Sequence, residues 1–199
     1  MNQPQESVQL GESRNLLAIT LVAGHGLKHL YSAAFTIILP EIKEGLALTN
    51  LAAGALSTSR EISSGVATLP AGFIADRYSG RWAQILTISM ALIAIGYLAS
   101  GSIQKYFAIS LAVILVGIGT SLWHPAAIAS LSDYFPKKRG FALSLHGSGG
   151  SIGEAIGPLI AGGALLAISW PHLLQWSFLP AALAAIGVWW LLKDKKGQK

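Results

Sequence analysis

Six long apolar blocks, separated by short polar connections, constrain the fold of this chain more than any other feature. They run approximately over residues 16–40, 46–75, 82–101, 106–132, 141–168 and 173–192. Each block has about the 20 residues that a helix needs to cross a bilayer. Only 12% of the residues are charged, against about 25% in a typical soluble domain. Only helices and closed barrels satisfy every backbone polar group in lipid, and the alternation typical of strands is missing. The sequence therefore predicts an all-α membrane protein with six transmembrane helices.

The charged ends of these blocks predict the orientation. We expect a cytoplasmic N-terminal segment (1–15), a six-helix bundle (16–192) and a cytoplasmic tail (193–199). The polar start lacks a basic region and a small-residue cleavage site, so no signal peptide is expected and the first block stays in the protein. With the connections assigned alternately to two sides, only Lys43 and Lys105 fall on one side. The other side holds ten basic residues: Arg14, Arg77, Arg81, Lys137, Lys138, Arg139, Lys193, Lys195, Lys196 and Lys199. This asymmetry places both termini in the cytoplasm, and we expect a bacterial cytoplasmic membrane.

The same distribution excludes other classes of function. The formal net charge of +5 orients the chain in the lipid bilayer, so no nucleic-acid partner is expected. There is no cysteine, which rules out disulfides and thiolate metal sites.

Ionisable residues within the blocks are the strongest indication of a site. Charged groups at membrane depth cost at least ~2.5–3.5 kcal/mol each, so they normally face a bundle interior or a wet cavity. The third and sixth blocks contain neither charge nor histidine. The other four contain His25, Lys28, His29, Arg60, Glu61, His124, His146 and Glu154. We therefore predict that four helices surround a polar substrate and proton pathway.

Helical spacing predicts the faces on which these residues lie. His25, Lys28, His29 and Ser32 share one stripe of the first helix. In the second helix, Glu61 belongs to a polar stripe and points into the seam, with Arg60 at its edge. Thr120 and His124 share a face just before Pro125 in the fourth helix, and in the fifth His146 shares a face with Gly150, Gly153 and Gly157.

Structural alternatives remain open for each group. Arg60 and Glu61 could each pair with a neighbouring helix and lock the bundle, and His124 and His146 could be satisfied packing histidines. His25 and His29 have a four-residue spacing that can chelate zinc, but spacing supplies no third ligand, so neither a metal site nor a cofactor is predicted.

The glycines of the fifth block are interpreted first as a packing motif. Gly149, Gly153 and Gly157 form a GxxxGxxxG run, and small residues at this spacing let membrane helices approach closely. Glu154 inside the run is less easily explained by packing, and we expect it to be a proton site or a partner for Arg60 or Lys28.

Two motifs carry a family resemblance. The stretch AGFIADRYSGRW, with Gly72, Asp76, Arg77 and Arg81, resembles the signature loop of the major facilitator superfamily, although Ser79 and Gly80 depart from it. In that family the loop acts as a conformational latch, which assigns this role to these four residues.

The second motif, GPLIAGG with Gly157 and Pro158, resembles the antiporter motif of the same family. The stretches GIGTSLWHPAAIA and RGFALSLHGSGGSIGEAIGPL are most similar to the fosmidomycin-resistance type of efflux carrier. The family's arginine in the fourth helix is missing here, which makes His124 a candidate substitute. The resemblance implies twelve helices in two halves, of which this chain would supply the N-terminal six. The second half would be a second copy or the rest of a longer carrier.

These observations predict a secondary transporter, or its N-terminal half, rather than an enzyme. It would move a small polar or anionic solute by alternating access, with the proton as coupling ion and with efflux as one direction. Helices one and four would line the cavity, two and five would face the second half, and three and six would be peripheral. Arg60 and Lys28 would bind the anion, while Glu61 or Glu154 with the histidines would carry the proton. The alternatives are a non-transporting membrane interaction module and an intramembrane serine hydrolase using Ser148.

Overall fold

The computed structural model describes the backbone of residues 3–193 and the side chains of residues 14–193. Almost all of this part is helical, which confirms the all-α prediction. The elements are α1 (Gln3–Gly45), α2 (Asn50–Arg77), α3 (Trp82–Ser102), α4 (Tyr106–Tyr134), the 3₁₀ turn η1 (Pro136–Lys138), α5 (Arg139–Leu165), α6 (Trp170–Trp176) and α7 (Phe178–Leu192). Lys195, Lys196 and Lys199 of the predicted tail lie outside the described residues.

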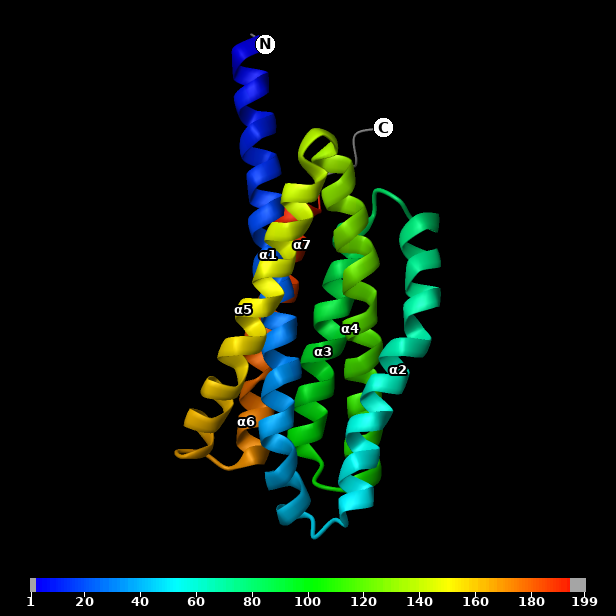
Figure 1. The fold of residues 1–199 in the computed structure, drawn as a ribbon, viewed down its shortest axis with the longest axis vertical. Helices are drawn as coiled ribbons and strands as arrows, with labels where there is room; N and C mark the ends of the chain where they lie inside the picture. Colours follow the sequence, from blue (N-terminus) through cyan, green and yellow to red (C-terminus); the bar gives the residue numbers. More distant parts are fainter. Residues whose placement is uncertain (1–2, 194–199) are drawn as a thin grey trace.

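The long helices run side by side along the long axis of the molecule (Figure 1). α1 packs chiefly against α5, while α4 packs between α2 and α3; α3 in turn contacts α6 and α7. In this view α2 and α5 form the two outer edges of the bundle. The core between the helices is filled by large side chains such as Leu86, Met90, Ile93 and the fully buried Trp123.

Two helix boundaries differ from the predicted blocks. α1 begins at Gln3 and continues through Pro40 to Gly45, so most of the predicted N-terminal segment is helical. The sixth block is two helices, α6 and α7, which are interrupted at Ser177. Pro180 has no N–H to bond the carbonyl of Trp176, four residues earlier, and the Ser177 carbonyl accepts a hydrogen bond from Tyr31 Oη at 2.6 Å. Both features weaken the helical ladder at the break.

Three segments of the described chain are long and apolar enough to cross a membrane: Trp82–Ser102, Tyr106–Tyr134 and Trp170–Leu192. The last of these comprises α6 and α7 together. The three helices that fall short, α1, α2 and α5, carry seven of the eight predicted pathway residues, and polar and glycine positions lower their mean hydropathy. Their exposed faces nevertheless carry large apolar side chains: Ile19 of α1 is 65% exposed, and Leu51, Leu69 and Phe73 of α2 and Leu159 of α5 are each at least 70% exposed. Apolar surface of this kind marks a face that contacts lipid or another protein.

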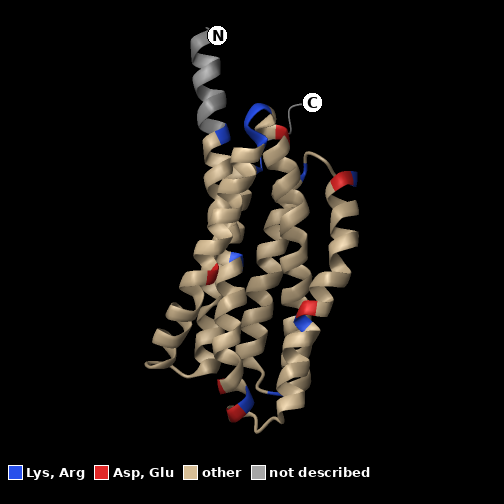
Figure 2. Cartoon of the chain, in the orientation of Figure 1, with Lys and Arg blue, Asp and Glu red and all other residues tan. Residues whose placement is uncertain are grey.

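Basic residues gather at one end of the bundle (Figure 2), the end at which α1 begins and α5 begins. Arg77 closes α2, Arg81 precedes α3, and Lys137 and Lys138 lie in η1. The opposite end carries a mixture of acidic and basic residues. The charge asymmetry predicted from the sequence therefore has a spatial counterpart in the described chain.

Candidate functional site

The α1–α5 contact brings the polar stripe of α1 close to α5. Gly149, Gly153 and Gly157 lie directly against the α1 backbone: a Cβ at Gly153 would overlap the carbonyl oxygen of Gly26. Gly150 in turn lies beneath the imidazoles of His25 and His29. The glycine run thus provides the close approach that sets these side chains beside α5, and Pro158 continues the same helix, half-buried.

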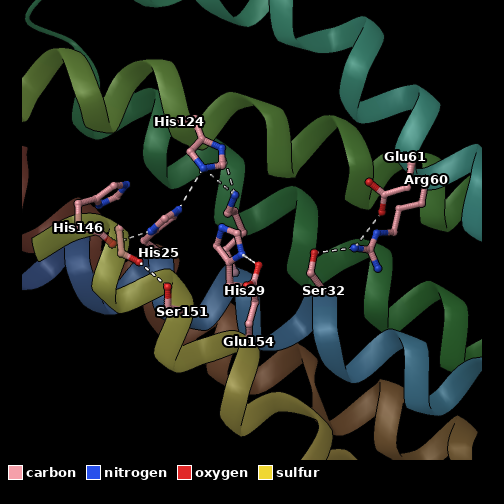
Figure 3. A network of polar contacts seen from close by, with 11 residues as sticks. His25, His29, Ser32, Arg60, Glu61, His124, His146, Ser151 and Glu154 are labelled. Atoms are coloured by element: carbon pink, nitrogen blue, oxygen red, sulfur yellow. Dashed lines mark hydrogen bonds and ion pairs between the residues drawn. The ribbon is translucent and has the colours of Figure 1, made fainter. Parts of the chain in front are cut away.

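Four histidines form a cluster where α1, α4 and α5 meet (Figure 3). His25 Nδ1 lies 2.8 Å from the carbonyl oxygen of His146, and His25 Nε2 lies 3.0 Å from His124 Nε2. The rings of His25 and His146 are stacked, with centroids 3.9 Å apart. Lys28 Nζ lies 3.1 Å from His124 Nδ1. His25, Lys28 and His146 are buried.

The hydrogen-bond partners assign the tautomers of this cluster. A carbonyl oxygen only accepts, so His25 Nδ1 carries the proton and its Nε2 accepts from His124 Nε2. His124 Nδ1 is then an acceptor for the amino group of Lys28. These bonds form one directed chain: Lys28 donates to His124, which donates to His25, which donates to the backbone of α5.

His29 and Glu154 form a hydrogen bond beside this chain. His29 Nδ1 lies 2.6 Å from Glu154 Oε1, and the Glu154 side chain is 59% exposed. The other ring nitrogen of His29, Nε2, is buried and has no hydrogen-bond partner among the described residues.

Arg60 lies deeper than Glu61, whereas the predicted stripe had Glu61 pointing into the seam and Arg60 at its edge. Arg60 is the buried member: its Nη2 donates to Ser32 Oγ of α1 at 2.5 Å, and its guanidinium lies over the ring of Phe35. The Glu61 side chain is 68% exposed and lies 3.3 Å from Arg60 Nη2. An ideal helical wheel does not show how a helix packs on its neighbours. α2 packs on α4 at Gly117, and for this reason the burial of Glu61 differs from that of the predicted stripe. Phe35, which supports Arg60, was missed, although it follows Ser32 by three residues on the same face.

A cavity of about 510 Å³ is shared by Lys28, His29, Arg60, Glu61 and Glu154, whereas His25, His124 and His146 are not among the described residues that line it. Its walls come from α1, α2, α4 and α5, the four helices predicted to surround a polar space; none of the described residues that line it belongs to α3, α6 or α7. The lining residues are Lys28, His29, Ser32, Ala33, Thr36, Arg60, Glu61, Thr120 and Glu154. Two cationic and two anionic side chains thus share one hollow, and such a site can hold a small polar or charged solute and exchange protons with it.

The predicted latch residues lie away from this cavity. Asp76 and Arg77 end α2, and Arg77 and Arg81 lie over the ring of Tyr78 at 5.8 and 6.0 Å. Asp76 is exposed and makes no ion pair within residues 14–193. Gly72 faces open space, since a Cβ there would have no atom of the described residues within 4 Å.

A helical bundle with a polar cavity between four helices, and with apolar outer faces, is the architecture of one half of a membrane transporter. Residues 21–199 match the family model of the Major Facilitator Superfamily, and the chain belongs to this family. Members of the family are transporters and not enzymes, so the hydrolase alternative is wrong. Ser148 Oγ, its proposed nucleophile, donates to the Ser144 carbonyl.

Similar proteins agree with this assignment. The fosmidomycin resistance protein of Escherichia coli (strain K12) is 26% identical over 162 residues, which cover 81% of this chain and 39% of that protein. A probable L-galactonate transporter of the same organism is 24% identical over 193 residues, or 96% of this chain and 42% of the relative. A bacterial homolog of the human lysosomal transporter Spinster, solved in an inward-facing and unoccupied conformation, superposes with a TM-score of 0.79 at 17% identity. That match covers 94% of this chain and 44% of the other. The chain therefore spans about two fifths of the length of the proteins it resembles.

Proposed function

We propose that this chain forms the N-terminal half of a secondary transporter that moves a small polar or anionic solute by alternating access, coupled to protons. The observation that carries the proposal is the single cavity lined by Lys28, Arg60, Glu61 and Glu154. One relative is named for an anion, L-galactonate, and another for resistance to fosmidomycin, which fits either an uptake or an efflux direction.

Anion binding is assigned to Arg60 and Lys28. Arg60 is held by Ser32 and Phe35, and its remaining N–H groups can reach into the cavity. A guanidinium with a fixed plane suits bidentate binding of a carboxylate or phosphonate. Lys28 reaches the same space from α1 as a compact cation.

Proton movement is assigned to the two carboxylates and the histidine chain. Glu61 and Glu154 are both accessible from the cavity, and each lies next to a basic partner that would be released on protonation of the carboxylate. Protonated Glu61 would free Arg60 for the anion. The directed bonds from Lys28 through His124 to His25 would let a proton move between the cavity and the buried histidines.

The same proposal includes the membrane arrangement. α1, α2 and α5 would cross the bilayer together with the three apolar spans, because their polar faces turn toward the cavity and their exposed faces are apolar. The basic end would lie in the cytoplasm of a bacterium. A second six-helix half, from a second copy or from a longer chain, would cover α2 and α5, and exposed Asp76 would pair with it as the latch.

The test is transport by the reconstituted protein. Proteoliposomes loaded with a pH-sensitive dye would receive L-galactonate or fosmidomycin, with and without an imposed pH gradient. We expect solute flux to follow the gradient and to move protons. Absence of any proton movement during measurable solute flux would contradict the coupling, and absence of flux from the fully assembled protein would contradict the transport proposal for these solutes.

Glu61→Gln should abolish the dependence of flux on the pH gradient. The amide keeps the shape of the side chain but cannot bind and release a proton, so coupled flux should fall at least about tenfold, as for loss of a positioned proton carrier. Glu41→Gln, which changes an exposed carboxylate outside the cavity, is the matched control. Wild-type coupling in Glu61→Gln would exclude Glu61 as the proton carrier.

A further inference from the structure

We propose that His25, His29 and His124 form a binding site for one divalent transition-metal ion of the zinc type. One ring nitrogen of each histidine can be chosen so that all three lie within 4.8 Å of one another. Zinc binds imidazole nitrogen at about 2.0–2.1 Å, so ligands of a tetrahedral site lie roughly 3.4 Å apart. Small rotations of three imidazoles would reach this geometry. The fold supplies in His124 of α4 the third ligand that sequence spacing could not identify.

In two of these histidines, the ring nitrogen that would not bind the metal already has the kind of hydrogen-bond partner that is typical of metal sites. A metal-ligating histidine typically bonds its other ring nitrogen to a carboxylate or a backbone carbonyl. His29 Nδ1 contacts the Glu154 carboxylate at 2.6 Å, and His25 Nδ1 contacts the His146 carbonyl at 2.8 Å. In both rings Nε2 is the nitrogen left for the metal.

One of these nitrogens is otherwise unexplained. His29 Nε2 is buried and makes no hydrogen bond among the described residues. A buried polar atom without a partner costs free energy, and a bound cation would remove that cost. His25 Nε2 faces His124 Nε2 at 3.0 Å, a contact in which a metal ion would replace the shared proton.

Lys28 is the natural competitor of the metal ion. Its Nζ lies 3.1 and 3.3 Å from the two ring nitrogens of His124 and donates to Nδ1. With a metal ion on Nε2, neutral His124 would carry its proton on Nδ1, so it could no longer accept from Lys28. The carboxylate of Glu154 on α5 offsets the positive charge of Lys28. Arg60 is paired with Glu61 farther along the cavity. Metal binding would displace Lys28 into the cavity that it already lines.

Three protein ligands leave a fourth position, and His29 lines the cavity, so that position would open toward it. Sites with an open position exchange their ions and bind an additional ligand more readily than closed structural sites. An anionic group in the cavity could complete the coordination. All three histidines belong to this chain, so binding requires neither transport nor a second half.

Equilibrium binding of Zn²⁺ tests the proposal. The full 199-residue chain would be purified without a polyhistidine tag, stripped with a chelator and titrated with Zn²⁺ by calorimetry. We expect one ion per chain. His29→Ala and His124→Ala should each weaken binding at least 100-fold. The control is His172→Ala, because His172 lies on α6, bonds to Ser169 and takes no part in the cluster.

Two further variants address the surroundings of the ion. Glu154→Gln should weaken Zn²⁺ binding by about 10–100-fold, as for other partners of ligating histidines. Lys28→Met should tighten it several-fold, because it removes the competitor for His124. Weaker binding in Lys28→Met would contradict the competition.

The wild-type protein provides a readout that does not depend on how the variants fold. Co²⁺ in a tetrahedral site with nitrogen ligands gives intense visible absorption, whereas octahedral aqueous Co²⁺ is nearly colourless. Stoichiometric, intense absorption that Zn²⁺ bleaches is the expected result. Octahedral spectra, no stoichiometric Zn²⁺ binding, or equal affinities of His124→Ala and His172→Ala would overturn the proposal.

Discussion

Arg60→Ala should reduce flux of an anionic solute about a hundredfold while the protein stays folded. Arg60 is buried, and its guanidinium is held over Phe35 by the bond to Ser32. Two lost charge-assisted hydrogen bonds to a bound anion correspond to roughly 3 kcal/mol or more, or about two orders of magnitude in affinity. Initial rates in proteoliposomes across a range of solute concentrations would measure the effect as a loss of apparent affinity.

Two variants separate charge from geometry in this experiment. Arg60→Lys keeps the charge but loses the planar fork, so it should recover only part of the flux. Arg14→Ala removes an arginine that lies over Phe135, outside the cavity, and should transport normally. Equal flux in Arg60→Ala and Arg14→Ala would show that Arg60 does not bind the solute.

Gly153→Ala should destabilise the bundle even though it adds a single methyl group to a helix. The new Cβ would overlap the carbonyl group of Gly26 and crowd the backbone nitrogen of Leu30, and backbone cannot move aside as a flexible side chain can. Overpacking of this kind costs about 1–3 kcal/mol or more. With ~2–4 °C per kcal/mol for a chain of this size, Tm should fall by roughly 2–12 °C.

Gly162→Ala is the matched control on the same helix. A Cβ at Gly162 meets no atom within 4 Å, and alanine favours a helix over glycine by about 1 kcal/mol. Its Tm should therefore rise or stay constant, opposite in sign to Gly153→Ala. Thermal unfolding in detergent, followed by aggregation or intrinsic fluorescence, gives both values. A Tm for Gly153→Ala as high as that for Gly162→Ala would contradict the close α1–α5 contact.

Helix positions could be predicted from the long apolar blocks, but the interruptions of the helices could not. The blocks 82–101 and 106–132 agree with α3 and α4 to within two residues. The break at Ser177 depends on Pro180 and on a hydrogen bond from Tyr31, 146 residues earlier in the chain. A contact of that separation leaves no local pattern in the sequence.

A shared space for the charged residues could also be predicted, because charges in apolar helices must find a polar surrounding. Lys28, Arg60, Glu61 and Glu154 do line one cavity. Their relative depths could not be predicted, since Arg60 is buried and Glu61 exposed only through the way α2 packs on α1 and α4.

The geometry of the histidine cluster could not be predicted from the sequence either. His124 reaches His25 at 3.0 Å because α4 and α1 approach where Gly24 accommodates the ring of Trp123. A glycine beside a buried tryptophan on another helix gives no signal until the two helices are in contact.

Cysteine accessibility most directly tests whether the cavity is a watery pathway between four helices. The chain contains no cysteine, so Thr36→Cys on α1 and Thr120→Cys on α4 would each carry the only thiol. In the assembled protein in a membrane, both should react rapidly with a charged thiol reagent, and bound solute should slow the reaction. Ser89→Cys on α3, at a fully buried position outside the cavity, should stay unreactive. Reaction of the two cavity thiols as slow as that of Ser89→Cys would contradict a shared aqueous cavity.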